Sequence, residues 1–196
     1  MTSAARTPSS PAIREMVPGD RTGVVAFIPA RGGSKRLPRK NLRLLAGLPL
    51  VEHAVALARS VTAIDRCIVS TDDAEIAAVA LTAGAEVIPR PGSLSGDTAS
   101  TASAACHAMS ELCRDGACPS IMVTLQPTCP MRTPALVERA LALFLAHRPD
   151  TVVSVSPVST KSGTLADGVF HPHYTPGARS QDLQPTVIEN GLVYVT

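Results

Sequence analysis

A cluster of basic residues surrounds a pair of glycines early in the chain. Between positions 31 and 43 the sequence has six basic residues and no acidic one: Arg31, Lys35, Arg36, Arg39, Lys40 and Arg43. Gly32 and Gly33 allow the backbone to bring amide groups close to an anion, and the cations supply positive charge. A polyphosphate suits this combination best. The residues follow neither the Walker A order nor the G-x-G-x-x-G dinucleotide fingerprint. A solvated basic loop, or a nucleic-acid-binding or nuclear-localisation-like cluster, is the competing interpretation.

Apolar segments alternate with amphipathic ones from residue 24 onward. The run at 24–28 predicts a strand that is covered on both faces and ends just before the basic cluster. Further strands are expected at 67–69, 85–88, 121–125, 152–155 and 192–195. Helices are expected at 50–60, from a cap at Asp72 to Gly84, at 97–114, and from Thr133 and Pro134 onward. The sequence therefore predicts an α/β fold, with a doubly wound, mostly parallel sheet and helices on both faces. Such sheets bind ligands beyond the carboxyl ends of their strands.

The composition bounds the class of protein. With 196 residues, 45% hydrophobic and 17% charged, the chain suits one globular domain at 23–196 and excludes wholesale disorder. Residues 1–22 are rich in Ser, Thr and Pro and have no apolar core, which predicts a disordered tail and no signal peptide. No apolar run approaches the ~18 residues of a membrane span. Three Phe, two Tyr and no Trp are too few to stack on single-stranded nucleic acid. We therefore expect neither a membrane nor a nucleic-acid partner.

The cysteines point to a cytoplasmic location. Five cysteines, an odd number without paired spacing, predict reduced thiols rather than a disulfide framework. Cys113 and Cys118 have no second pair at metal-ligand spacing, so no zinc site is expected. Cys67 and Cys106 are interpreted as small core residues.

Several blocks of the sequence resemble the acylneuraminate cytidylyltransferases, also called CMP-sialic acid synthetases. Residues 28–41 (IPARGGSKRLPRKN) are similar to the signature loop of that family. The other matching blocks follow in family order: 69–73 (VSTDD), Arg90-Pro91, 97–100 (DTAS), 125–133 (LQPTCPMRT), 153–155 (VSV), 181–183 (QDL) and 189–194 (ENGLVY). One such block could arise by chance, but a series in order is specific to the family.

The resemblance implies a Rossmann-like nucleotidyltransferase that transfers CMP from CTP to a nonulosonic (sialic-type) 2-keto sugar acid, with release of pyrophosphate and with Mg²⁺ as cofactor. It assigns the triphosphate and catalysis to Arg31, Lys35 and Lys40, helped by Ser34 and by Gly32 and Gly33. Nucleotide contacts are expected from Asn41, Arg90, Asp97, Thr98 and Ser100. Gln126 and Asn190 are expected to face the sugar acid, and Lys161 and Arg179 are candidate partners for its carboxylate.

The end of the sequence departs from the family pattern. The family continues past its Asn-Gly strand to closely spaced aspartates that bind the catalytic metal. Beyond Asp150 this sequence has only Asp167, Asp182 and Glu189 as acidic residues, none in a D-x-D arrangement, before Thr196. The metal-binding segment is therefore expected to be absent, and three explanations stay open: the sequence is a fragment, it is a natural short form, or the metal is held differently. Without a metal we expect slow chemistry. Residues 157–185 correspond in position to the family's dimerisation lobe, which implies a homodimer.

Each block also has a simpler interpretation. Asp72 and the 97–100 turn can be helix caps only, Gln126 a polar turn residue and Arg90 a solvated loop cation. Two other functions stay open: cytidylyl transfer to another acid, such as a phosphonate, and nucleotide binding without catalysis.

Overall fold

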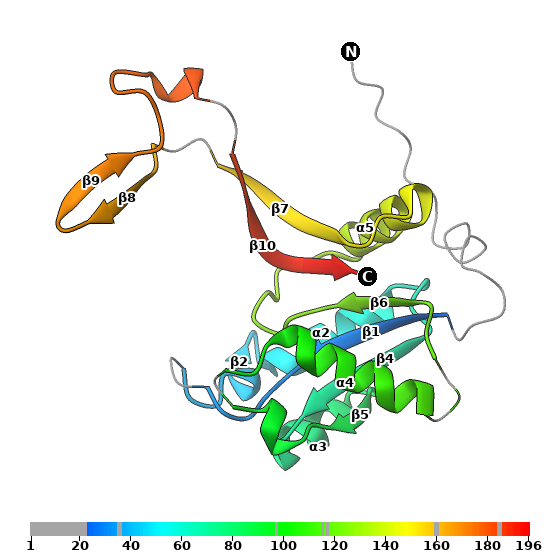
Figure 1. Cartoon of the computed structure of the whole chain (residues 1–196). Coiled ribbons are helices and arrows are strands. Elements are labelled where there is room, and N and C mark those ends of the chain that lie inside the picture. Colours follow the sequence, from blue (N-terminus) through cyan, green and yellow to red (C-terminus); the bar gives the residue numbers. More distant parts are fainter. Residues whose placement is uncertain are drawn as a thin grey trace. The chain divides into compact units, whose positions relative to one another are not determined.

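A central sheet organises the computed structural model, which describes residues 23–34, 37–96, 98–114, 116, 118–158, 161–183 and 186–196. The tail expected at 1–22 lies outside these residues. The sheet has six strands in the order β5-β4-β1-β6-β10-β7 (Figure 1). Their bounds are β1 (Val24–Pro29), β4 (Arg66–Thr71), β5 (Glu86–Pro89), β6 (Ile121–Thr124), β7 (Val152–Val158) and β10 (Thr186–Val195). β1 pairs in parallel with β4 and β6, and β4 with β5, whereas β10 runs antiparallel to β6. The mostly parallel α/β sheet predicted from the sequence is confirmed.

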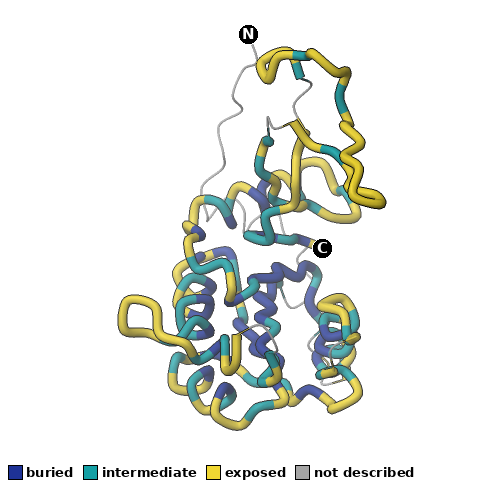
Figure 2. The backbone as a smooth tube through the Cα atoms, turned by 90° about the vertical axis from the view of Figure 1, so that its left-hand side faces the viewer, coloured by how far each residue is buried: buried dark blue, intermediate teal, exposed yellow. Residues whose placement is uncertain are grey.

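Helices cover both faces of this sheet. Successive side chains of β1 point to opposite faces and so contribute to two separate cores. Val24, Ala26 and Ile28 pack on one side, among buried residues of α2 (Leu50–Ser60), α3 (Ala74–Thr82) and α5 (Pro134–His147). Val25 and Phe27 pack on the other, against α4 (Thr101–Arg114). Figure 2 shows the buried stretches in dark blue. None of the described helices is long and apolar enough to cross a membrane.

Two predicted helix starts were wrong by a few residues. Asp73, not Asp72, caps α3, and its carboxylate accepts hydrogen bonds from the amides of Glu75 and Ile76 at 2.9 and 3.1 Å. The reason is that β4 extends to Thr71, whose hydroxyl accepts from the Asp73 amide at 3.1 Å. Similarly, α4 begins at Thr101 rather than near 97, because the Ser100 hydroxyl accepts from the amide of Ser103 at 3.0 Å.

The cysteine prediction also needs correction. The chain turns back after α4 through Gly116, whose φ is +76°, and Cys113 and Cys118 form a disulfide with their Cα atoms 4.0 Å apart. Cys106 is exposed rather than in the core, because it lies outside the buried stripe of α4. Cys67 is buried as predicted.

The chain divides into two compact units. The first comprises Met1–Val153 with Gly191–Thr196, and the second is Ser154–Asn190, which includes the expected lobe at 157–185. The second unit contains the antiparallel hairpin of β8 (Gly163–Ala166) and β9 (Val169–Pro172), orange in Figure 1, and the short helix η3 (Ser180–Asp182). In the first unit, β2 (Leu44–Leu45) and β3 (Leu48–Pro49) form a small hairpin after the short helix η1 (Lys40–Leu42), and η2 (Gly92–Leu94) follows β5.

Candidate nucleotide-binding site

A pocket of about 200 Å³ opens at the carboxyl ends of β1, β5 and β6. Three loops and the start of α4 form its wall. The lining residues are Pro29, Arg31, Gly33, Ser34, Lys40, Asn41, Arg90, Ala99, Ser100, Thr101, Gln126, Pro127 and Thr128. Among these described residues three are cationic and none is acidic. An anionic ligand would therefore meet positive charge that the lining itself does not neutralise.

Most of the residues singled out from the first unit's sequence meet in this pocket. They are Arg31, Gly33, Ser34, Lys40, Asn41, Arg90, Ser100 and Gln126. Thr98 does not line it, and Lys35 and Asp97 lie outside the described residues. Sequence reasoning assigned no role to Pro29, Thr101, Pro127 and Thr128. Small or neutral residues carry no chemical signal of their own, so only their adjacency to the charged ones could have indicated them.

Arg90 is buried rather than solvated. Only 9% of the residue is exposed, and its Nε and Nη2 donate to the Ser70 hydroxyl and carbonyl at 3.1 and 2.8 Å. Its own amide donates to the carbonyl of Thr71 at 2.8 Å, which fixes the chain just after β5. Burial lowers the pKa of the Arg90 guanidinium; nearby Asp72 opposes this shift and Arg31 adds to it. The side chain is thus a fixed cation in the pocket wall, held by neutral partners.

Two side-chain hydrogen bonds fix parts of the basic loop, defined here as residues 30–43: one within the loop and one to the chain at Gly96. Asn41 is 5% exposed, and its Nδ2 donates to the carbonyl of Arg31 at 2.9 Å. Arg31 in turn donates from Nη1 to the carbonyl of Gly96 at 2.8 Å. Lys40, beside Asn41 in η1, forms no ion pair with any described residue. Asn41 and Arg31 are therefore held in place, while the Lys40 ammonium is available to a ligand.

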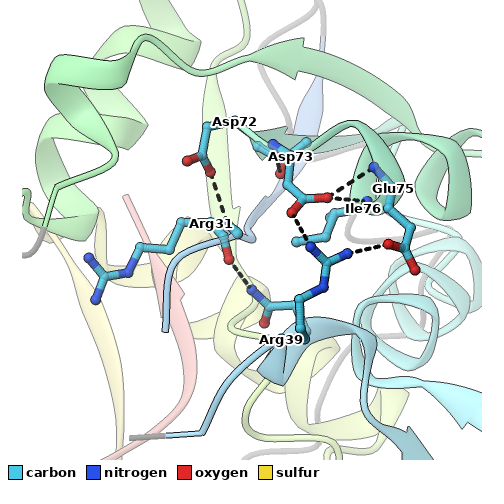
Figure 3. A network of polar contacts seen from close by, with 9 residues as sticks. Arg31, Arg39, Asp72, Asp73, Glu75 and Ile76 are labelled. Atoms are coloured by element: carbon cyan, nitrogen blue, oxygen red, sulfur yellow. Dashed lines mark hydrogen bonds and ion pairs between the residues drawn. The ribbon is translucent and has the colours of Figure 1, made fainter. Parts of the chain in front are cut away.

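The turn after β4 anchors this loop (Figure 3). The Gly32 amide donates to Oδ1 of Asp72 at 2.9 Å, whereas the guanidinium of Arg31 points away from that carboxylate. Gly32 does not line the pocket. A Cβ atom on Gly32 would lie 2.6 Å from Oδ2 of Asp73, so only glycine permits this close approach. Asp72 is therefore an anchor for the loop instead of the helix cap predicted from the sequence.

Arg132 is a further residue that the sequence did not single out. It follows the Gln126–Thr128 wall and is 7% exposed, and its Nη1 donates to the carbonyl of Leu192 at 2.9 Å. Burial lowers its pKa to about 10, although the nearby Cys129 works in the opposite direction. The bond ties the 126–133 loop to β10.

The second unit holds the other three predicted residues. Asn190 bonds to the hydroxyls of Ser154 and Ser156 at 2.7 and 3.0 Å. Arg179 forms two hydrogen bonds with the carboxylate of Asp182, at 2.7 and 3.2 Å. The ammonium of Lys161 lies 5.5 Å from the ring centre of Tyr174. Their assignment to the sugar acid stays a prediction.

Comparisons with known proteins agree on one chemistry. A model of the cytidylyltransferase family matches residues 25–173. The CMP-N,N'-diacetyllegionaminic acid synthase of Legionella pneumophila is 41% identical over 143 residues, covering 70% of this chain and 60% of that protein. The N-acylneuraminate cytidylyltransferase of Streptococcus agalactiae is 32% identical over 180 residues, 88% of this chain and 43% of that protein. A solved structure of a CMP:2-keto-3-deoxy-manno-octonic acid synthetase complexed with CTP has the same fold. Its TM-score is 0.68 at 23% identity, over 88% of this chain and 73% of that chain. The chain thus spans about half the length of the two curated relatives.

Proposed function

Because the chain belongs to the cytidylyltransferase family, we propose that it transfers CMP from CTP to a nonulosonic 2-keto sugar acid and releases pyrophosphate. The observation that carries this proposal is the pocket at the carboxyl ends of the strands. Its lining includes Arg31, Lys40 and Arg90 without an acidic residue among those described. A triphosphate is the small ligand whose charge this lining complements. The names of the two curated relatives support a sugar acid as acceptor.

The proposed reaction is an in-line displacement at the α-phosphorus of CTP. The C2 hydroxyl of the acceptor attacks and releases its proton to solvent water, its oxygen forms a bond to the α-phosphorus, and the bond to the bridging oxygen of pyrophosphate breaks. Negative charge then grows on the leaving pyrophosphate, and cations fixed in advance stabilise it. Arg31 offers a planar fork and Lys40 a point charge for this purpose. Lys35, in the same loop, is assigned the same part.

The nucleoside is proposed to lie toward Arg90 and the start of α4. The pocket wall there consists of Ala99, Ser100 and Thr101, next to the buried guanidinium of Arg90. Hydroxyls, a fixed cation and backbone groups can pair with the ring edge of cytosine and with ribose. Asp97 and Thr98 are included in this assignment from the family resemblance.

From the family resemblance, Gln126 of the first unit is a proposed contact of the sugar acid. Asn190, Lys161 and Arg179 of the second unit are assigned to the sugar acid on the same ground alone. Arg179 and Asn190 already have partners inside that unit, so acceptor contacts would require these bonds to be exchanged. The acceptor's carboxylate would suit either cation.

Mg²⁺ belongs to this proposal through the family resemblance, and when bound it would shield the charge of the triphosphate. The described residues contain no group of three or more His, Cys, Asp or Glu that could hold a metal ion. Asp72 and Asp73 already accept hydrogen bonds from Gly32 and Arg39. The steps above therefore use the chain's own cations.

We also propose a homodimer that acts in the cytoplasm on small molecules rather than on nucleic acid. The β8–β9 hairpin supports the dimer, because Leu165 and Phe170 lie opposite each other and are 72% and 52% exposed. Exposed apolar pairs of this kind are typical of surfaces that a partner covers. Sedimentation of the wild type and of a Leu165→Ser, Phe170→Ser double variant tests this. A monomeric wild type would contradict it.

Pyrophosphate release tests the proposed reaction. The chain is supplied with CTP, Mg²⁺ and, in turn, N-acetylneuraminic acid, N,N'-diacetyllegionaminic acid and a hydroxyphosphonate, with UTP as the nucleotide control. Release with CTP and a nonulosonic acid supports the proposal. Release with the phosphonate alone assigns another acceptor, and CTP binding without release for any acceptor indicates a binding protein.

A further inference from the structure

Arg39 differs from Arg31 and Lys40, the described cations of the basic loop that line the pocket, because it faces α3 instead. Its Nη1 donates to Oδ2 of Asp73 at 3.0 Å, and its Nη2 forms an ion pair with Glu75. Figure 3 shows the guanidinium between these two carboxylates. Arg39 does not line the pocket. Its charge is thus balanced by two carboxylates of the protein at the surface, unlike that of the neighbouring Lys40.

The backbone at Arg39 determines where the next two residues point. Arg39 has φ 56° and ψ 31°, a left-handed conformation that is unfavourable for most non-glycine residues and needs support from its surroundings. Its carbonyl accepts from the amide of Leu42 at 2.9 Å and so closes η1. Lys40 and Asn41, the pocket-lining residues of the loop's second half, both lie inside that turn.

Asp73 caps α3 and also contacts the basic loop at two points, Gly32 and Arg39. Its Oδ1 caps α3 while its Oδ2 accepts from Arg39, and Gly32 approaches the same side chain closely enough to exclude a Cβ. The first half of the loop is also held by Asp72 through Gly32. The loop is therefore attached to the β4–α3 turn at Gly32 and at Arg39. The pocket-lining residues Lys40 and Asn41 follow directly after the second attachment.

We propose that Arg39 is a positioning residue for the proposed CTP site: its ion pairs with Asp73 and Glu75 hold the basic loop in the form that presents Lys40 and Asn41 to the triphosphate. This inference rests on the proposed function. Glu75 is 69% and Arg39 48% exposed, so each pair is weak by itself, but two pairs from one guanidinium restrict the loop more than one. Their effect falls on phosphate binding rather than on the stability of the fold.

The test compares two single variants and their combination. Arg39→Asn removes the ion pairs but keeps a residue type that tolerates the left-handed conformation. Glu75→Gln removes one partner and leaves the Asp73 cap intact. Calorimetric titration with CTP and with cytidine gives the affinity for the phosphates and for the nucleoside separately. Arg66→Asn is the matched control, because Arg66 pairs with Glu86 at the opposite ends of the strands.

We expect Arg39→Asn to weaken CTP binding about fivefold and Glu75→Gln about twofold, with cytidine affinity unchanged. The double variant should be no worse than Arg39→Asn, since both changes break the same attachment. The control should leave both affinities unchanged. If Arg39 contacted phosphate directly, Glu75→Gln would leave CTP binding unchanged or strengthen it, and that result would overturn the proposal.

Hydrogen exchange without nucleotide separates this inference from the proposed function. The amides of Leu42 and Arg43 bond to the carbonyls of Arg39 and Lys40 at 2.9 and 3.1 Å. Both should exchange faster in Arg39→Asn and Glu75→Gln than in the wild type. Unchanged exchange contradicts the positioning role. A wild type that binds no CTP but shows the faster exchange in its variants contradicts only the proposed function.

Discussion

Two hollows lie at opposite edges of the parallel sheet in the first unit, one at carboxyl ends and one at amino ends of strands, and their charges differ. The hollow at the carboxyl ends measures about 200 Å³, and Arg31, Lys40 and Arg90 are its only charged described lining residues. The hollow at the amino ends of β4 and β5 is larger, about 260 Å³, and its charged residues are Arg59, Asp65, Arg66 and Glu86. Two cations face two carboxylates there, so the charges cancel.

The polar groups of the amino-end hollow are used to hold the fold together. Arg66 donates to both carboxylate oxygens of Glu86, at 2.9 and 2.7 Å, and Arg59 donates to the carbonyl of Gly84 at 2.6 Å. Oδ2 of Asp65 accepts from the amide of Val24 at 2.8 Å. At the carboxyl ends, in contrast, Arg39 forms ion pairs with Asp73 and Glu75, whereas Lys40 has no ion pair among the described residues. Uncompensated charge, rather than volume, distinguishes the candidate site.

The largest expected difference in kcat/KM is between two matched substitutions, one arginine replaced by methionine in each hollow. Arg31→Met should lower kcat/KM for CTP about 100-fold, because a fixed cation near the growing charge of the transition state is lost. Arg59→Met, the matched change at the amino ends, should change it less than about twofold. Pyrophosphate release under saturating acceptor measures both. Equal losses in the two variants would remove the distinction between the hollows.

A smaller effect is expected at the edge of the carboxyl-end pocket. Gln126→Ala should raise the KM for the sugar acid about tenfold, the loss expected for one hydrogen bond to a charged group, while the KM for CTP stays constant. Initial rates at varied acceptor and varied CTP separate the two constants. A rise in the KM for CTP instead would show that Gln126 contacts the nucleotide rather than the sugar acid.

At the amino ends the expected effect is on stability. The hydrogen bond from Arg66 lowers the pKa of Glu86, so the ionised form is favoured in the folded protein. The stabilisation is present above the unfolded pKa and is lost as the pH falls through the folded pKa. Glu86→Gln should cost less than about 1 kcal/mol near pH 7, since the side chain is half exposed, and nothing in strong acid. Urea unfolding at both pH values measures this, and a cost that persists in acid would assign it to packing.

The smallest expected effect concerns the thiol in the amino-end hollow. Burial raises the pKa of Cys67 to about 12, so the thiol stays protonated and a poor nucleophile near neutral pH. Iodoacetamide should modify the exposed Cys106 first and leave Cys67 intact, as read by mass spectrometry of peptides. Modification of Cys67 at the rate of Cys106 would mean that this hollow opens in solution.

The sequence predicts the fold well where a pattern is local. The apolar run of β1, the cap and proline that begin α5, and the loops after each strand all follow from neighbouring residues. Asp72 was misassigned because two aspartates in succession can both cap a helix, and the choice depends on where β4 ends. The Cys113–Cys118 bond was missed because it depends on a turn at Gly116.

The candidate site shows the same limit. The six cations of the basic loop form one cluster in the sequence, yet Arg39 pairs with two carboxylates whereas the adjacent Lys40 lines the pocket. Their separation depends on Asp73 and Glu75, which lie more than 30 residues away in the chain. Arg90 is likewise held in its buried position by a hydrogen bond to Ser70, which lies on the neighbouring strand β4. Such pairings become visible only once the sheet order is known.

The central claim is that the carboxyl-end pocket binds CTP through its triphosphate. Calorimetric titration of the wild type, of Lys40→Met and of the charge-matched control Arg114→Met, with CTP and with cytidine, tests it most directly. Arg114 pairs with Glu111 at the end of α4 and does not line the pocket. We predict that Lys40→Met weakens CTP binding at least about tenfold and leaves cytidine binding unchanged, while the control matches the wild type. Equal CTP affinity in all three proteins would contradict the claim.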